Sequence, residues 1–212
     1  VLAIHGLNVD ADDDDFLIVP QLEAGRSISD PRFFGNPTPD GVNDPTVGAP
    51  VDPVEFSRLG GTFTETSFSV SLSTASSDAT IYYTLNGTVP SQSSVKYVGP
   101  LTISNTTQVR ARAFEPGRAV GPVNTESYIG LSIDIQNFST DIPIFVIDNF
   151  GAGSVPSNTK QISHVTIFEP GENGWAHVDQ GHEIETRAGL KTRGSSTSGQ
   201  SYSVETWDDH IN

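Results

Sequence analysis

Short runs in which apolar and polar residues alternate are the sequence feature that most constrains how this chain can fold. Such runs occupy residues 68–72, 81–85 and 109–114, and turn-forming residues separate them at 76–78, 86–87 and 115–117. Because successive side chains of a strand point to opposite faces of its sheet, alternation with a period of two predicts β-strands. Several short strands at this spacing are typical of an antiparallel sandwich. We therefore expect an all-β fold, since no stretch has a helical period of useful length.

The charge and the residue usage exclude several classes of function. The 212-residue chain has a formal net charge of −15, although only 17% of its residues are charged. Nucleic-acid binding needs a basic surface that neutralises phosphates, so we expect no nucleic-acid partner. There is no cysteine for a disulfide or a thiolate metal site, and no apolar stretch approaches the roughly 18 residues that indicate a membrane span. The chain also lacks methionine, even at position 1, so we expect it to be an internal piece of a larger protein.

Prolines and glycines divide the sequence into segments. Two prolines and an Asp-Gly pair within residues 36–41 disfavour a helix or a central strand, so a first domain is expected to end there. Pro45, Pro50 and Pro53 then stiffen a short linker. The expected parts are a partial β domain over residues 1–44, the linker over 45–53, a sandwich over 54–130 and a further β-rich part over 131–212.

One of these segments carries a family resemblance. Residues 81–90 read IYYTLNGTVP, and they are followed by YVGP at 97–100 and VRARAF at 109–114. This pattern closely resembles the chitobiase/β-hexosaminidase C-terminal-type domain, over about residues 54–129. The family usually has Asp where Asn86 stands, a change that keeps the turn chemistry. The resemblance implies an immunoglobulin-like sandwich.

The flanking segments carry two further resemblances. Residues 33–43, FFGNPTPDGVN, look like the end of a lamin-tail-type domain. Residues 141–148, DIPIFVID, and 187–196, RAGLKTRGSS, are similar to the start of the spore-coat CotH family, in which residues 201–205 would form the next strand. We associate this order of domains with large bacterial surface proteins. It implies a secreted, extracellular or cell-surface location.

CotH-type proteins are atypical protein kinases, so the CotH resemblance implies phosphoryl transfer as a candidate activity of the parent protein. Such catalysis needs a cation on the phosphates, acidic ligands for Mg²⁺ and a base near the attacking hydroxyl. The family commonly has lysine just before the Ser-Tyr strand, whereas Gln200 stands there in this chain. Lys191 and Arg193 are the remaining candidates for nucleotide binding, with ordinary strand positions as the alternative. Mg²⁺-ATP would be a cofactor only if a CotH-type half of the parent protein is active.

Two clusters of polar residues are candidates for metal binding. Ca²⁺ prefers several carboxylate and carbonyl oxygens, so an acidic run near the start of the chain is a candidate calcium site, with a solvated loop as the alternative. This run comprises Asp10, Asp12, Asp13, Asp14 and Asp15. A second set contains His177, Asp179, His182 and Glu183. Its two histidines lie five residues apart and therefore on opposite faces of a strand, so we expect loop or surface positions rather than a metal site.

Two sets of residues are candidates for contact with sugars, one as attachment sites and the other as a stacking surface. Asn86, Asn105 and Asn137 each begin a glycosylation sequon. Separately, an aromatic set could stack on sugar rings, although packing in the core is the expectation that we favour. This set comprises Tyr82, Tyr83, Tyr97, Trp175 and Trp207.

The sequence contains no complete active site. The serine-nucleophile elbow, the phosphate-binding loop and the zinc-protease motif are all missing from it. We therefore expect a non-catalytic structural or adhesive module of a large secreted or cell-surface bacterial protein, which contacts other surface proteins or copies of itself. The alternatives are the N-terminal portion of a secreted CotH-type kinase and a carbohydrate-binding accessory module with a glycan partner.

Overall fold

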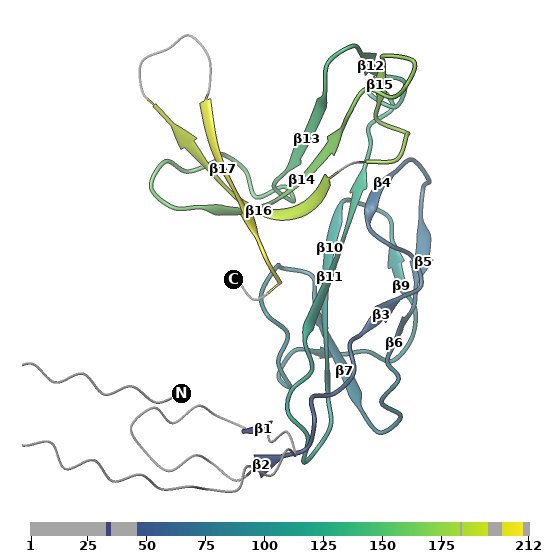
Figure 1. Ribbon diagram of the computed structural model, residues 1–212, viewed down its shortest axis with the longest axis vertical. Helices are drawn as coiled ribbons and strands as arrows, with labels where there is room; N and C mark the ends of the chain where they lie inside the picture. Colours follow the sequence, from purple (N-terminus) through teal and green to yellow (C-terminus); the bar gives the residue numbers. More distant parts are fainter. Residues whose placement is uncertain (1–32, 35–45, 183, 195–200, 210–212) are drawn as a thin grey trace, which may run out of the picture. The chain divides into compact units, whose positions relative to one another are not determined.

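The computed structural model describes residues 33–34, 46–182, 184–194 and 201–209, all of them within one compact unit, Arg32–Asn212. Every regular element in this part of the chain is a β-strand (Figure 1). The prediction of an all-β fold is therefore confirmed. The described part of the chain begins with a short antiparallel pair, β1 (Phe33–Phe34) and β2 (Thr46–Val47).

Two layers of strands form a sandwich. The larger layer is a sheet in the order β4-β11-β10-β7-β8. Its strands are β4 (Gly61–Phe63), β7 (Thr80–Thr84), β8 (Val95–Lys96), β10 (Thr107–Phe114) and β11 (Val123–Gly130). The opposite layer consists of two antiparallel pairs, β3 (Glu55–Phe56) with β6 (Leu72–Ser73) and β5 (Phe68–Val70) with β9 (Leu101–Ile103). All pairings are antiparallel except β4 with β11, which is parallel.

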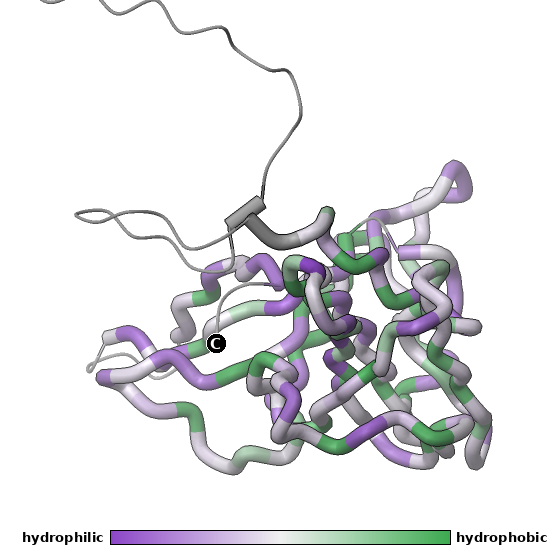
Figure 2. The backbone as a smooth tube through the Cα atoms, turned by 90° about the horizontal axis from the view of Figure 1, so that it is seen from below, coloured by the Kyte–Doolittle hydropathy of each residue, from purple (hydrophilic) through white to green (hydrophobic). Residues whose placement is uncertain are grey.

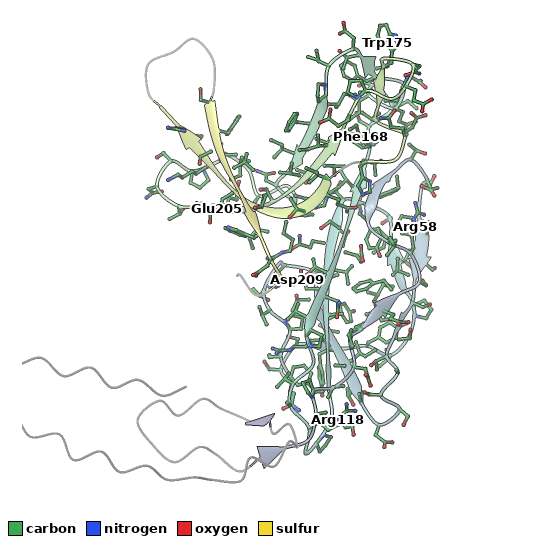
Figure 3. All side chains as sticks on the ribbon, viewed as in Figure 1. Arg58, Arg118, Phe168, Trp175, Glu205 and Asp209 are labelled. Atoms are coloured by element: carbon green, nitrogen blue, oxygen red, sulfur yellow. The ribbon has the colours of Figure 1, made fainter. Side chains whose placement is uncertain are left out.

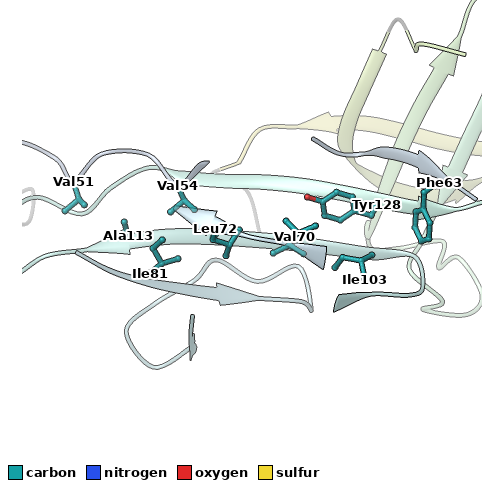
Figure 4. Close-up of a cluster of buried hydrophobic side chains, with 11 residues drawn as sticks. Val51, Val54, Phe63, Val70, Leu72, Ile81, Ile103, Ala113 and Tyr128 are labelled. Carbon is teal, nitrogen blue, oxygen red and sulfur yellow. The ribbon is translucent and has the colours of Figure 1, made fainter. Parts of the chain in front are cut away.

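The sandwich core lies between these layers, where apolar side chains from both meet (Figure 4). The fully buried members include Val70, Val109 and Tyr128. The alternation seen in the sequence explains this core, because Val109, Ala111 and Ala113 are alternate residues of β10 that all point into it. Val51 also belongs to the core, so the residues just before β3 pack onto the sandwich.

A second sheet follows in the sequence. It has the order β13-β14-β16-β17, with antiparallel neighbours throughout. Its strands are β13 (Ile144–Asp148), β14 (Gln161–Phe168), β16 (Ile184–Arg193) and β17 (Ser201–Trp207). A small pair, β12 (Ser139–Thr140) with β15 (Ala176–His177), lies beside it. Leu131, Ile144, Phe168, Ala176 and Val178 form a second, smaller core.

The two faces of the second sheet differ in composition. The inner face, which carries His164, Glu185, Arg187 and Trp207, meets residues of the sandwich. The opposite face is called the outer face. By the strand register, it comprises Phe145, Ile147, Gln161, Ser163, Val165, Ile167, Ile184, Thr186, Ala188, Leu190, Thr192, Tyr202, Val204 and Thr206. None of these aligned positions holds a charged residue.

Hydropathy follows the same alternation along the chain. Hydrophobic and hydrophilic residues follow one another at short intervals along the described part of the chain (Figure 2). No helix in the described ranges has the length and apolar character needed to cross a membrane.

Candidate functional site

Several charged side chains gather where β10 and β11 meet the inner face of the second sheet. A cavity of about 610 Å³ opens there. Its lining comes from the loop before β4, from β11, from the second sheet and from the residues just after β17. The lining residues are Leu59, Gly60, Thr125, Glu126, Ser127, His164, His182, Glu185, Thr186, Arg187, Trp207, Asp208 and Asp209.

Two carboxylates converge on Gly60 in this cavity. Glu126 Oε2 accepts a hydrogen bond of 2.6 Å from the Gly60 backbone N–H. A Cβ atom placed on Gly60 would lie 2.9 Å from Glu126 Oε2 and 2.5 Å from Glu185 Oε1. A side chain at this position would therefore collide with both carboxylates. The absence of a side chain at residue 60 is what allows Glu126, from the sandwich, and Glu185, from the second sheet, to approach one another.

Burial perturbs the acidity of both members of this pair, and the charge of Glu126 also acts on Glu185. Desolvation, followed by the nearby charge of Glu126, raises the pKa of Glu185 to about 7. Burial also raises the pKa of Glu126, against the opposing effect of the Gly60 hydrogen bond. Glu185 is consequently a carboxyl group that changes its charge near neutral pH.

Two histidines contact Glu185. His182 Nε2 lies 3.0 Å from Glu185 Oε2, and His164 Nε2 lies 3.4 Å from Glu185 Oε1. His164 Nε2 also contacts Thr166 Oγ1 at 3.0 Å. Burial, together with the proximity of His182, lowers the pKa of His164 to about 4. His164 is therefore neutral at pH 7, and its contact with Glu185 is not an ion pair.

Two buried arginines join the sheets, and we call them the arginine clamp. Arg110, on β10, donates from Nη1 to the Gly87 carbonyl at 2.6 Å and from Nη2 to the Asp209 carbonyl. Arg187, on β16, donates from Nη1 to the Asp208 carbonyl at 2.7 Å and from Nε to Gln108 Oε1 at 3.4 Å. Asp209, just after β17, lies beside the sandwich strands (Figure 3).

The clamp keeps its positive charge despite burial. Desolvation, followed by the repulsion of Arg187, lowers the pKa of Arg110 to about 10, which leaves the guanidinium protonated at neutral pH. Desolvation also lowers the pKa of Arg187, while Asp209 and Asp208 oppose that effect. Buried charged donors are stabilising only when their partners are in place, so the clamp fixes the end of β17 against the sandwich.

These contacts explain why polar residues of β10 are buried. Gln108 and Arg110 alternate with core residues and point away from the sandwich core. In an isolated sandwich they would face water, but the second sheet covers them here. Gln108 Nε2 donates to Ser127 Oγ at 3.1 Å within the sandwich sheet, which leaves its Oε1 to accept from Arg187. Thr62 Oγ1, on β4, donates to the Val178 carbonyl at 3.1 Å, which adds a contact between the sandwich and the segment just after β15.

The cavity has some, but not all, of the features of a catalytic site. A carboxyl group with a pKa near 7 beside an imidazole is suited to proton transfer. Within the described ranges, no group of three or more metal-ligating side chains with suitable geometry occurs. The arginines bond to backbone carbonyls and to Gln108, and two of these bonds, from Arg110 to Asp209 and from Arg187 to Gln108, cross between the sheets. Their arrangement serves to join the two sheets.

The predicted nucleotide-binding residues lie outside the cavity lining. Lys191 and Arg193 are ordinary positions of β16, paired with Ser203 and Ser201, and neither lines the cavity. Their role in binding a nucleotide stays a prediction. The acidic run from Asp10 to Asp15 falls outside the described residues, so calcium binding there also stays a prediction.

The second histidine set is only partly brought together. His177 lies in β15, whereas His182 lies beside Glu185 in the cavity. Sequence reasoning missed Glu126, Glu185, His164 and the arginine clamp. One signal was available for the clamp, because arginines within an apolar strand such as residues 109–114 need buried partners.

The sequons and the aromatic residues lie apart from the cavity, except for Trp207. Asn86, Asn105 and Asn137 are all exposed, which leaves room for a sugar, and glycosylation stays a prediction. Tyr83 and Tyr97 pack against the sandwich core, and Tyr82 meets Phe114 edge to face at 5.5 Å. Trp207 is buried over Gly189, whereas Trp175 is half exposed.

The fold and its contacts define an all-β protein with an immunoglobulin-like sandwich. Residues 59–125 match the family model of the chitobiase/β-hexosaminidase C-terminal domain. The resemblance carried by the Tyr-Tyr-Thr-Leu-Asn-Gly-Thr run is thereby confirmed for this segment. Comparisons of the chain with curated proteins and with solved structures gave no match. The lamin-tail and CotH resemblances of the flanking segments stay predictions.

Proposed function

We propose that this chain is a non-catalytic structural module of a larger secreted or cell-surface protein. In this role the sandwich acts as a spacer, and the second sheet presents a surface to other proteins, which are other surface proteins or copies of itself. The observation that carries the proposal is the arginine clamp. It uses the buried charged groups between β10 and β16 to hold the two sheets together.

The match of residues 59–125 to the chitobiase/β-hexosaminidase C-terminal domain is compatible with a non-catalytic module. The contacts between the sheets agree with that role. Arg110 and Arg187 each bond to backbone carbonyls, which are permanent partners, and neither is directed at open solvent. Groups that are occupied in this way support a rigid connection rather than a turnover site.

Turnover assays test the proposal directly. Glu185 is the residue that most resembles a catalytic acid or base, so the intact chain and its Glu185→Gln variant should be assayed together. The substrates are chromogenic glycosides and, for the kinase alternative, ATP with Mg²⁺ and a protein acceptor. We expect no turnover from either protein.

Three other outcomes would favour a different function. Glycoside turnover that disappears in Glu185→Gln would make the cavity an active site and refute the proposal. ATP consumption that disappears in Lys191→Ala would support the kinase alternative. Binding to a glycan array that is lost in Tyr97→Ala would support the carbohydrate-binding alternative.

A further inference from the structure

The cavity between the sandwich and the second sheet has an acidic lining. Besides two histidines, the charged groups around it are four carboxyl groups and one guanidinium, namely Glu126, Glu185, Asp208, Asp209 and Arg187. The Arg187 guanidinium is directed at the Asp208 carbonyl and at Gln108 Oε1, as part of the arginine clamp. With Glu185 ionised, the lining therefore carries more negative than positive charge, and this charge lies at the cavity itself.

Two buried polar atoms of the lining have no hydrogen-bond partner among the described residues. They are His164 Nδ1 and Thr125 Oγ1. His164 is only 2% exposed, and a polar atom that is buried without a partner costs free energy. Glu126 accepts from the Gly60 N–H through Oε2 alone. The cavity wall thus offers more hydrogen-bonding atoms than the surrounding described residues use, which indicates a site for a bound group.

Glu126 and Glu185 are placed so that one cation can contact both. The Cβ position of residue 60 lies 2.9 Å from Glu126 Oε2 and 2.5 Å from Glu185 Oε1, so these two oxygens are close neighbours. On the side of the pair that faces the cavity, one ammonium nitrogen can reach both at about 2.7 to 2.9 Å, the length of a charge-assisted hydrogen bond. A cation in this position would also offset the repulsion between the two carboxylates.

The remaining lining favours an organic ammonium over a metal ion. Within the described ranges, no three side chains form a metal-ligating group, whereas an alkylammonium needs only three acceptors for its three N–H donors. The cavity volume of about 610 Å³ is typical of small-molecule pockets and far exceeds the space of one water molecule. Leu59, which is 75% exposed, and Trp207 add apolar lining against which an aliphatic chain can pack.

We propose that this cavity binds a primary aliphatic ammonium group, with its nitrogen between Glu126 and Glu185 and its carbon chain against Leu59 and Trp207. A free alkylamine presents this chemistry, and so does the lysine side chain of another protein. The inference goes beyond the proposed function, because a structural joint between the two sheets needs no ligand.

Binding at this site should depend on pH through Glu185. Burial and the charge of Glu126 raise the pKa of Glu185 to about 7, and a bound cation opposes both causes. The ammonium therefore binds the ionised form, so its affinity should fall about ten-fold from pH 8 to pH 6. The other titratable or charged groups around the cavity are His164, His182, Glu126, Arg187, Asp208 and Asp209. Protonation of any of them at lower pH adds positive charge and acts in the same direction.

The test is an NMR titration of the intact chain with n-butylamine and with Nα-acetyl-lysine amide, at constant ionic strength. The indole N–H signal of Trp207, in the cavity lining, should shift until the site is saturated. The indole of Trp175, which is 49% exposed and lies outside the cavity, is the internal control and should not shift. n-Butanol, a neutral molecule of the same length, should leave both signals in place. Binding of both amines would show that a lysine side chain fits, whereas binding of n-butylamine alone would assign the site to free amines.

Two variants assign the binding to the carboxylate pair. Glu185→Gln removes one of the two charges and should bind n-butylamine at least ten-fold more weakly, without the dependence on pH. Glu172→Gln removes the same charge from an exposed position outside the cavity and should bind as wild type does. Circular dichroism checks that both variants are folded.

Several results would overturn the inference. These are equal shifts with n-butanol, equal shifts of the two tryptophans, equal weakening by Glu172→Gln, or no saturable shift with either amine. Mg²⁺ that moves the Trp207 signal in wild type but not in Glu185→Gln, where the amines have no effect, would show a metal site instead. Glycoside or ATP turnover would refute the proposed function, whereas absent amine binding without turnover would refute only this inference.

Discussion

Replacing Glu185 with Gln should change how the stability of the protein depends on pH. The pKa of Glu185 rises from its ordinary value of 4.5 to about 7 in the folded chain. The folded state therefore binds a proton more tightly than the unfolded state does, and this residue destabilises the fold above pH 7. Each pKa unit corresponds to about 1.4 kcal/mol, so the full penalty is about 3 kcal/mol. It disappears as the pH falls from 7 toward 4.5.

His164 acts in the opposite direction over nearly the same range. Its pKa falls from 6.5 to about 4, so the unfolded state binds the proton more tightly. Stability that is present above pH 6.5 is lost as the pH falls toward 4, again by about 3 kcal/mol. Between about pH 4.5 and 6.5, the folded state holds one proton on this pair, at Glu185, and the unfolded state also holds one, at His164. The two effects on stability therefore nearly cancel. Unfolding moves that proton from Glu185 to His164.

Urea denaturation at pH values from 8 to 4, followed by tryptophan fluorescence, tests this reasoning. In wild type the contributions of Glu185 and His164 should offset one another over this range. Glu185→Gln should be more stable than wild type by about 3 kcal/mol at pH 8, and this advantage should vanish by pH 4. The exposed Glu172, changed to Gln, is the matched control and should leave the profile unaltered. An advantage of Glu185→Gln that grows toward acid, or a profile parallel to wild type, would refute the reasoning.

Three further substitutions probe single contacts. Arg110→Met removes the two hydrogen bonds that the guanidinium donates to the Gly87 and Asp209 carbonyls, so it should lower the free energy of unfolding by about 2 to 4 kcal/mol. An unchanged urea midpoint would contradict this. Gly189→Ala places a Cβ against the Trp207 ring, so we expect the free energy of unfolding to fall by about 1 to 3 kcal/mol and the tryptophan emission to shift to the red. An unshifted spectrum would show that the ring is packed elsewhere. Tyr128→Phe removes the 2.7 Å hydrogen bond to the Arg58 carbonyl and should cost about 1 kcal/mol in thermal or urea unfolding, with no change in the secondary structure seen by circular dichroism.

The sandwich could be predicted from the sequence because the patterns that indicate it lie within single strands and single turns. Alternation over residues 109–114 predicts a strand with Val109, Ala111 and Ala113 on one face, and the structure buries these three residues together. The Asn-Gly pair at residues 86–87 likewise predicts a turn, and Gly87 has a φ of 79°, which favours glycine. The strand predicted at residues 201–205 also lies within β17.

The charged cavity could not be predicted in this way, because its members are distant in sequence. Glu126 and Glu185 meet only through the packing of the second sheet on β10 and β11, and alternation says nothing about which sheet covers which face. Gly60 shows the same limit, since nothing local indicates that two carboxylates occupy the space beside it. Likewise, burial of Arg110 follows from contact with the end of β17, about a hundred residues later in the chain.

The central claim is that the charged groups between the sheets form a structural joint. The most direct test is amide hydrogen exchange of the intact chain, read by mass spectrometry in wild type and in Arg110→Met. If the clamp joins the sheets, the substitution should reduce protection in β10 and also in β16 and β17, which lie across the contact. A loss of protection confined to β10 and its sandwich neighbours would contradict the claim, because the two sheets would then be energetically independent.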